Sequence, residues 1–230
     1  MASGRQRRDP DGEGLHPGIV TALSTRGGQG ERVAVYLDGK RAFDIASCVA
    51  AKAGLSKDEW LSEERQSELL REDEPHRARE MALGMLARRD LLSVEVVSRL
   101  QERGVSETVA VETSGWLQER GFIGDRRYAT TYINHRTKAG WGRQRILAEL
   151  ARRGLDRQLA KDVWEASAER LDGAEQVERL AELVGRRFGA QLMSDPEGAT
   201  RRANGFLARR GHDWETISAV LAAVRGRTLS

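Results

Sequence analysis

The sequence predicts a mainly α-helical protein, built from tandem three-helix (helix-turn-helix-like) repeats in an elongated, curved array with a small N-terminal β-meander. Three observations lead to this fold class. Helix-forming residues dominate the chain, and only four prolines interrupt them. A short stretch near the N-terminus has the two-residue periodicity of strands. A helix-stop and helix-start signature then recurs three times in the rest of the chain.

The N-terminal stretch indicates three strands. Residues 19–23 form the first candidate, and residues 33–37 and 43–45 form the next two. Asp38-Gly39 lies between the last two and favours a type I′ hairpin turn, which needs positive φ at both central positions. We therefore expect a three-stranded meander.

The rest of the N-terminal region is expected to contain a tail, a hairpin tip and two helices. Residues 1–16 are polar and glycine-rich, which is typical of a disordered tail. The glycines of 27–30 indicate a hairpin tip, because the Lys-Ser/Thr pair of a phosphate-binding loop does not follow them. Helices are expected over 46–54 and 57–71, packed on the strands.

Beyond Pro75 the chain is predicted to be helical to its end. Ala78, Met81, Ala82 and Met85 lie three or four residues apart, which places them on one helix face. These residues belong to a helix expected over 76–89, and comparable helices are expected over 126–138 and 174–188.

A pair of helices is expected after each of those three. The pattern Leu-x-x-Arg-Gly ends at Gly104, Gly154 and Gly211. Glycine just beyond a helix end accepts the left-handed conformation that satisfies the last carbonyls. The residues two positions further on are of N-cap type: Ser106, Asp156 and Asp213. Each site therefore encodes a helix, a tight turn and another helix.

Three such units and the strands give the domain organisation. The units stack in a row, because a three-helix module of this size closes its own core poorly. We expect these segments: a tail (1–16), a β-meander with helices (17–74), and three-helix repeats at 75–122, 123–170 and 171–227.

Composition excludes several classes of protein. No apolar run approaches the roughly 18 residues that cross a bilayer. The single cysteine, Cys48, rules out an internal disulfide and fits a reducing compartment, so we expect a cytoplasmic protein. The four histidines form no metal-binding pattern, and no nucleophile, Walker or zinc-protease motif is present. We expect no enzyme activity, no metal and no cofactor.

Charge is uneven along the chain. Residues 57–80 hold nine acids and five bases, whereas residues 125–161 hold ten bases and three acids. Such a basic segment attracts polyanions such as nucleic acid. The alternative is that the arginines solvate outer helix faces, and charge alone does not decide between the two.

The central segment resembles the RecX family of recombination regulators. The resemblance rests on Gly121-Phe122-Ile123-Gly124-Asp125 and on the residues that follow: Tyr128, Ala129, Tyr132, Arg136, Gly140, Gly142, Arg143, Ile146, Glu149, Leu150, Gly154 and Leu155. Residues 203–211 match the family's final repeat, with His212 where an aromatic residue is usual. The resemblance covers the chain from about residue 18 onward.

This resemblance implies tandem three-helix repeats and binding to the RecA recombinase. It also implies inhibition of the ATPase, co-protease and strand-exchange activities of RecA. A monomer that contacts the RecA filament, with non-specific DNA contacts through the basic repeat and no membrane, is the expected form.

The candidate contact residues all lie in the basic repeat: Arg126, Arg127, Arg136, Lys138, Trp141, Arg143, Arg145, Arg152 and Arg153. Taken singly, each arginine fits a solvated or helix-terminal role better than a direct contact, whereas the group as a patch favours an interface. Trp141, between two glycines, is either an exposed partner anchor or a plug between helices. Trp116, Trp164 and Trp214 are expected in the core.

Two other functions remain open at this stage. A sequence-specific repressor would read bases from the second helix of a pair, where residues 156–158 and Lys161 are the only suitable polar set. A scaffold that binds only protein would show no affinity for DNA.

Overall fold

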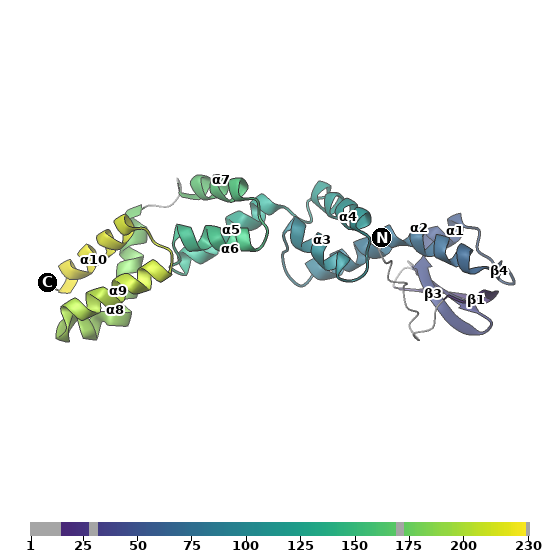
Figure 1. Ribbon diagram of the computed structural model, residues 1–230, viewed down its shortest axis with the longest axis horizontal. Helices are drawn as coiled ribbons and strands as arrows, with labels where there is room; N and C mark the ends of the chain where they lie inside the picture. The colour runs from purple at the N-terminus through teal and green to yellow at the C-terminus, as the bar shows by residue number, and fades with distance from the viewer. Residues whose placement is uncertain (1–14, 28–31, 169–172, 229–230) are drawn as a thin grey trace, which may run out of the picture. The chain divides into compact units, whose positions relative to one another are not determined.

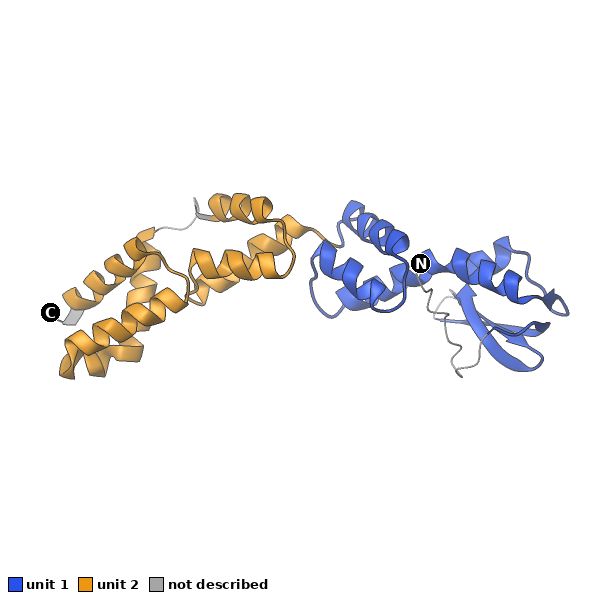
Figure 2. Ribbon diagram, viewed as in Figure 1, with its two compact units in different colours: residues 1–122 blue, residues 123–230 orange. Residues whose placement is uncertain are grey.

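The computed structural model describes residues 15–27, 32–168 and 173–228, and Figure 1 labels its helices and strands. The contacts divide the chain into two compact units, residues 1–122 and 123–230 (Figure 2). The first unit contains a sheet and helices, and the described part of the second is entirely helical. The mainly α fold with an N-terminal β-extension is therefore confirmed. The curvature of the array and the finer division into repeats stay predictions.

Four antiparallel strands form the sheet, in the order β3-β2-β1-β4. They are Gly18–Arg26 (β1), Arg32–Leu37 (β2), Lys40–Ala46 (β3) and Trp60–Leu61 (β4). Asp38 and Gly39 have φ values of 48° and 81°, which confirms the hairpin turn. Strand β4 was not predicted, because two residues carry no periodic signal. The predicted tail falls mainly on residues 1–14 and the hairpin tip mainly on 28–30, both outside the described residues.

Helices α1 (Ser47–Lys52) and α2 (Glu63–Leu86) lie on this sheet. The buried residues between them form the core of this region: Val20, Val33, Val35, Leu37, Phe43, Ile45, Ala46, Val49, Ala50, Leu61 and Leu69.

Helix α2 continues through Pro75. The sequence predicts two helices here, over 57–71 and 76–89, because proline removes a backbone donor and crowds the preceding turn. That prediction is wrong. Leu69 and Ala78 are both buried, so tertiary packing on either side of the proline holds one continuous helix. Residue 75, the predicted start of the first repeat, lies inside this helix.

The helix also carries two buried carboxylates next to the proline. Asp73 is 1% exposed and accepts hydrogen bonds from Arg32 at 2.8 Å and from the backbone N–H of Ala46 at 2.7 Å. Burial alone lowers the pKa of Arg32, but Asp73 and then Glu80 raise it above its ordinary value overall. The Asp73 carboxylate therefore fastens α2 to the sheet.

The remaining helices follow in groups. The first unit continues with α3 (Ser93–Gln101) and α4 (Glu107–Glu119). The second unit begins with α5 (Asp125–Lys138), α6 (Arg143–Arg152) and α7 (Arg157–Ala168). It ends with α8 (Gly173–Ser194), α9 (Pro196–Arg209) and α10 (Trp214–Thr228). Helix α7 packs against both α5 and α6, and α10 packs against both α8 and α9.

The predicted turns are confirmed in detail. Gly104, Gly154 and Gly211 have φ values of 82°, 89° and 83°. In each turn the residue after the glycine donates its N–H to a carbonyl five residues earlier, as Leu155 does to Leu150 at 3.1 Å. This pattern is the Schellman motif, which satisfies carbonyls at the helix end. The same hydrogen bond follows Gly54, Gly121 and Gly140, so the signal is used more often than the three repeats reveal.

The predicted caps are confirmed at two of three turns. The carboxylates of Asp156 and Asp213 each accept a backbone N–H three residues later, at 2.8 Å. Ser106 holds the N-cap position of α4 but makes no side-chain cap. Its hydroxyl instead donates to Glu74 at 3.2 Å, and its backbone N–H donates to the same carboxylate at 3.0 Å.

The tryptophans divide between core and surface. Trp164 is 9% exposed, as predicted for the core, and Trp116 is half-buried under two arginines. Trp214 is 72% exposed, so its predicted place in the core is wrong. It occupies the first turn of α10, where the core is formed by Ile217, Val220 and Val224 on another face.

Candidate basic interface

The candidate interface begins on α5, the first helix of the second unit. Gly124 precedes the helix in an extended conformation, and Asp125 lies in its first turn. Basic residues occupy its last turn, where positive charge suits the carboxyl end of the helix dipole. Arg126, Arg127 and Lys138 are all exposed on this helix. The side chains of Arg126 and Lys138 form no hydrogen bond or ion pair with a described residue, so their charge is available to a partner.

Arginine side chains and aromatic rings alternate in a continuous stack between α5 and α6. Its members, in order, are Arg145, Trp141, Arg136, Tyr132 and Arg153. The guanidinium carbons lie 4.0 to 5.1 Å from the ring centroids, within the range of cation–π attraction. In this cation–aromatic stack, three positively charged guanidinium groups lie close together and are partly shielded from water.

Trp141 lies between Arg145 and Arg136 in the stack and is half-buried. Arg136 covers it at 4.4 Å and Arg145 at 4.0 Å. The arrangement therefore favours the second of the two sequence interpretations, a ring held between helices rather than an open anchor.

The loop that carries Trp141 is joined to the turn between α9 and α10. Gly142 donates its N–H to the carbonyl of Arg210 at 2.7 Å, and Gln144 donates to Gly211 at 3.1 Å. A Cβ added to Gly142 would lie 2.3 Å from the carbonyl oxygen of Gly211, so only glycine fits. This backbone contact, the α6–α9 junction, fixes the basic repeat against the final three helices.

Two side chains of the turn complete the junction. His212 places Nε2 at 3.1 Å from the carbonyl of Gly140, and Arg210 donates to Ala139 at 2.7 Å. Burial lowers the pKa of His212, and the nearby Arg210 lowers it further against the opposing effects of Gly140 and Asp213. Burial also lowers the pKa of Arg210. The junction thus favours a neutral imidazole.

Carboxylates of the repeat are occupied by internal partners. Glu149 accepts from Arg152 at 2.7 Å and lies 3.8 Å from Arg153. The hydrogen bond from Arg152 holds the pKa of Glu149 below its ordinary value. Glu165 lies 3.8 Å from Arg143, and Asp156 caps α7. Few carboxylates are left to neutralise the exposed cations.

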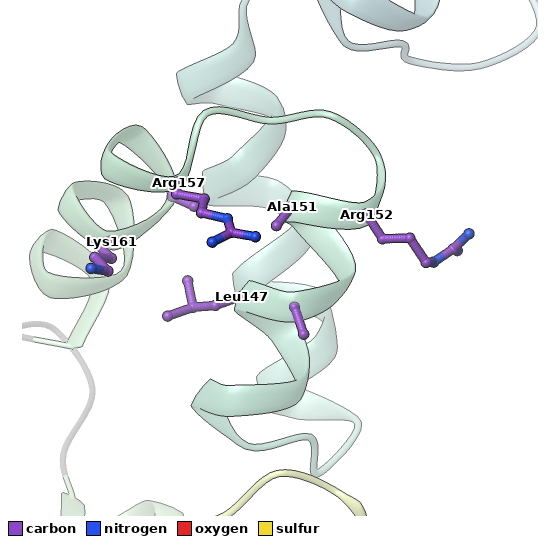
Figure 3. A pocket seen from close by; sticks show the side chains of 7 residues that line it. Leu147, Ala151, Arg152, Arg157 and Lys161 are labelled. Atoms are coloured by element: carbon purple, nitrogen blue, oxygen red, sulfur yellow. The ribbon is translucent and has the colours of Figure 1, made fainter.

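A groove of about 540 Å³ lies between α6 and α7 (Figure 3). Its lining residues come from both helices: Leu147, Ala148, Ala151, Arg152, Arg157, Ala160 and Lys161. Leu147 and Arg157 point toward the space between the helices, whereas Arg152 extends away from it. The floor is apolar, and Arg157 and Lys161 form a basic rim.

The structure distributes the nine predicted contact residues in two ways. Six are exposed, namely Arg126, Arg127, Lys138, Arg143, Arg145 and Arg152. Three are half-buried, namely Arg136, Trp141 and Arg153. The cation–aromatic stack brings together Arg136, Trp141, Arg145 and Arg153, and it leaves outside the other five: Arg126, Arg127, Lys138, Arg143 and Arg152. The site assignment stays a prediction.

Sequence reasoning missed the groove. From the sequence, Arg157 and Lys161 are expected as part of the basic segment and as base-reading residues, and not as the edge of a groove. Leu147, Ala148 and Ala151 follow the core positions Ile146 and Leu150 along α6, so they read as part of one apolar stripe. The available signal was that the apolar stripe on α6 is wider than one helix face.

Within residues 15–27, 32–168 and 173–228, no cluster of three metal-ligating side chains is present, and no helix could cross a membrane. Cys48 is exposed, with its Sγ 3.6 Å from Nε2 of His76.

Comparisons with known proteins agree with this architecture. Residues 125–163, which span α5, α6 and much of α7, match the family model "RecX, second three-helix domain". A regulatory protein RecX of Pseudomonas entomophila is 33% identical over 150 residues, covering 65% of this chain and 93% of the relative. One of Pseudomonas savastanoi is 32% identical over 154 residues, covering 67% and 96%.

Two crystal structures share the fold. A regulatory protein RecX superposes with a TM-score of 0.64 at 20% identity, covering 90% of this chain and 98% of that one. RecX from Lactobacillus salivarius gives 0.60 at 19% identity, covering 66% and 97%. Because this chain covers nearly the whole length of relatives about one-third identical to it, it belongs to the RecX family.

Proposed function

We propose that this chain binds the RecA filament on DNA and lowers the ATPase, co-protease and strand-exchange activities of RecA. Membership of the RecX family supports the choice of partner. On this proposal the protein acts in the cytoplasm as a non-enzymatic monomer. Its DNA contacts are non-specific.

The excess of exposed positive charge on α5, α6 and α7 carries the proposal. Four cations of this repeat are exposed, and their side chains form no hydrogen bond or ion pair with any described residue: Arg126, Lys138, Arg157 and Lys161. Glu149, Glu165 and Asp156, by contrast, are held by internal partners. Unneutralised cations attract both DNA phosphates and acidic protein surfaces.

Titration of RecA's single-stranded-DNA-dependent ATP hydrolysis tests the proposal. We expect inhibition at amounts below or near those of RecA. Changing the four cations to Gln should raise the half-inhibitory concentration at least about tenfold, because salt-sensitive contacts are lost. Hydrolysis that stays unchanged up to a clear excess of this protein would contradict the proposal.

A matched variant controls for net charge. Lys57, Arg71, Arg77 and Arg88 are also exposed, and their side chains form no hydrogen bond or ion pair with a described residue, but they lie in the first unit. Changing these four to Gln removes the same charge and should change the half-inhibitory concentration less than about twofold. An equal loss in both variants would show that net charge matters and that the repeat does not.

The alternative of a helix-turn-helix repressor needs free base-reading groups on α7. Asp156 is used as a cap, and Gln158 donates to Asp162 at 2.8 Å. Gel shifts with unrelated duplexes separate the two functions. Uniform, steeply salt-dependent binding supports the filament regulator, whereas binding to one sequence only supports the repressor.

A further inference from the structure

We propose that the groove between α6 and α7 docks an acidic amphipathic helix of a protein partner. The inference rests on the proposed function for the source of that helix, which is the recombinase filament. It goes further by assigning this groove to protein and not to nucleic acid.

The first argument is the apolar floor. Helix α6 already buries Ile146 and Leu150 in the core of its repeat. Leu147, Ala148 and Ala151 form a second apolar strip, which faces the groove. Ala148 is exposed, and Leu147 and Ala151 are half-buried, so the described chain covers this strip only in part. Small alanines in such a floor let another helix approach closely.

The second argument is the rim. Arg157 and Lys161 lie one turn apart on α7 and are both exposed. Neither forms a hydrogen bond or an ion pair with a residue that the structure describes. The nearby acids Asp162 and Glu165 are engaged with Gln158 and Arg143. Carboxylates spaced one turn apart on a docked helix would match this pair of cations.

The apolar floor and the basic rim together indicate which class of molecule the groove binds. A phosphate backbone would satisfy Arg157 and Lys161 but would leave the apolar floor against charged groups. A small ligand would need several convergent polar groups to orient it, but the only polar side chains of the lining are the cations Arg152, Arg157 and Lys161, and Arg152 extends away from the groove. A helix with one apolar and one acidic face satisfies both parts.

Filling the floor tests the inference. The double variant Ala148→Leu/Ala151→Leu occupies the groove without changing charge. Two readouts are needed: the half-inhibitory concentration in the RecA ATPase assay and the Kd for a labelled oligo-dT. We expect the first to rise at least about tenfold and the second to stay within about twofold.

A matched control places the same substitutions elsewhere. Ala190 of α8 and Ala208 of α9 are exposed and line no part of the groove. Ala190→Leu/Ala208→Leu should leave both readouts within about twofold of the unaltered protein. Circular dichroism and thermal melting check the fold. If the groove variant loses helix content, the single variant Ala151→Met takes its place.

Each other outcome overturns the inference in a recognisable way. Undiminished inhibition by the filled variant would show that the groove is not used, although the proposed function would stand. Equal loss of inhibition and oligonucleotide binding would identify nucleic acid as the occupant. Absence of inhibition by the unaltered protein would overturn the proposed function and this inference together.

Discussion

The two units use the same helix–turn–helix signature as a joint, but they secure it by different chemistry. In the first unit the turn after α3 leads to Ser106, which donates twice to the Glu74 carboxylate. In the second unit the turn after α9 packs backbone against backbone. The carbonyls of Arg210 and Gly211 there accept from the loop before α6. One joint depends on a buried carboxylate, and the other on close backbone packing at Gly142 and Gly211.

The comparison separates two reasons for glycine in the same signature. Gly104 and Gly211 both adopt the left-handed conformation, with φ values of 82° and 83°. Open space surrounds the Cβ position at Gly104, whereas a Cβ at Gly211 would lie 2.4 Å from the backbone nitrogen of Arg145. The same signature therefore contributes differently to stability at the two sites, because a segment distant in sequence packs against Gly211 and not against Gly104.

The largest effect is expected at the crowded glycine. Gly211→Ala adds backbone crowding to the cost of a left-handed alanine, so the free energy of unfolding should fall by about 3 kcal/mol. Gly104→Ala adds only the cost of a left-handed alanine, about 1 kcal/mol in the free energy of unfolding. Urea denaturation followed by circular dichroism measures both. Equal losses would refute the packing difference between the joints.

The charged joint should lose less. Glu74→Ala removes the acceptor of the Ser106 N–H and hydroxyl, and we expect a loss of about 2 kcal/mol in the free energy of unfolding. The loss is limited because the freed hydroxyl can cap α4. Glu72→Ala, an exposed acid 3.5 Å from Lys52, is the control and should change stability by less than about 0.5 kcal/mol. A double-mutant cycle with Ser106→Ala measures the coupling directly.

Features encoded within a few neighbouring residues were predictable. The hairpin at Asp38-Gly39 and the turns at Gly104, Gly154 and Gly211 depend on local backbone conformation, and the structure has all of them. The same holds for the caps at residues 156 and 213. Local codes of this kind act whatever packs around them.

Features that depend on distant partners were not predictable. Pro75 lies within a helix because residues on both sides of it are buried. Asp73 is buried because Arg32 and the N–H of Ala46 reach it from the sheet. The groove arises from the packing of α7 beside α6. Helical periodicity places a residue on a face, but it does not say what meets that face.

A smaller effect is expected within the cation–aromatic stack next to the backbone joint. Arg145→Ala removes a guanidinium 4.0 Å from the Trp141 ring and its hydrogen bond to Arg209 at 3.2 Å. We expect a loss of about 1 kcal/mol in the free energy of unfolding, because the cation–π contact is partly exposed. Arg143→Ala breaks only an exposed pair with Glu165 and should cost less than about 0.5 kcal/mol. Equal losses would show that the stack adds nothing beyond a surface ion pair.

The smallest effect is a pH dependence confined to the second unit's joint. Because the folded protein lowers the pKa of His212 below its ordinary value of 6.5, the unfolded chain takes up the proton first as the pH falls. The stability that comes from the neutral imidazole is therefore present above pH 6.5 and is lost as the pH falls toward the folded pKa. His212→Phe should flatten the change in unfolding free energy between pH 7.5 and about pH 5.5, a range above the usual titration of carboxylates. His135→Phe, at an exposed position on α5, should retain the slope of the unaltered protein. A slope that survives in His212→Phe would place the titrating group elsewhere and leave the joint insensitive to pH.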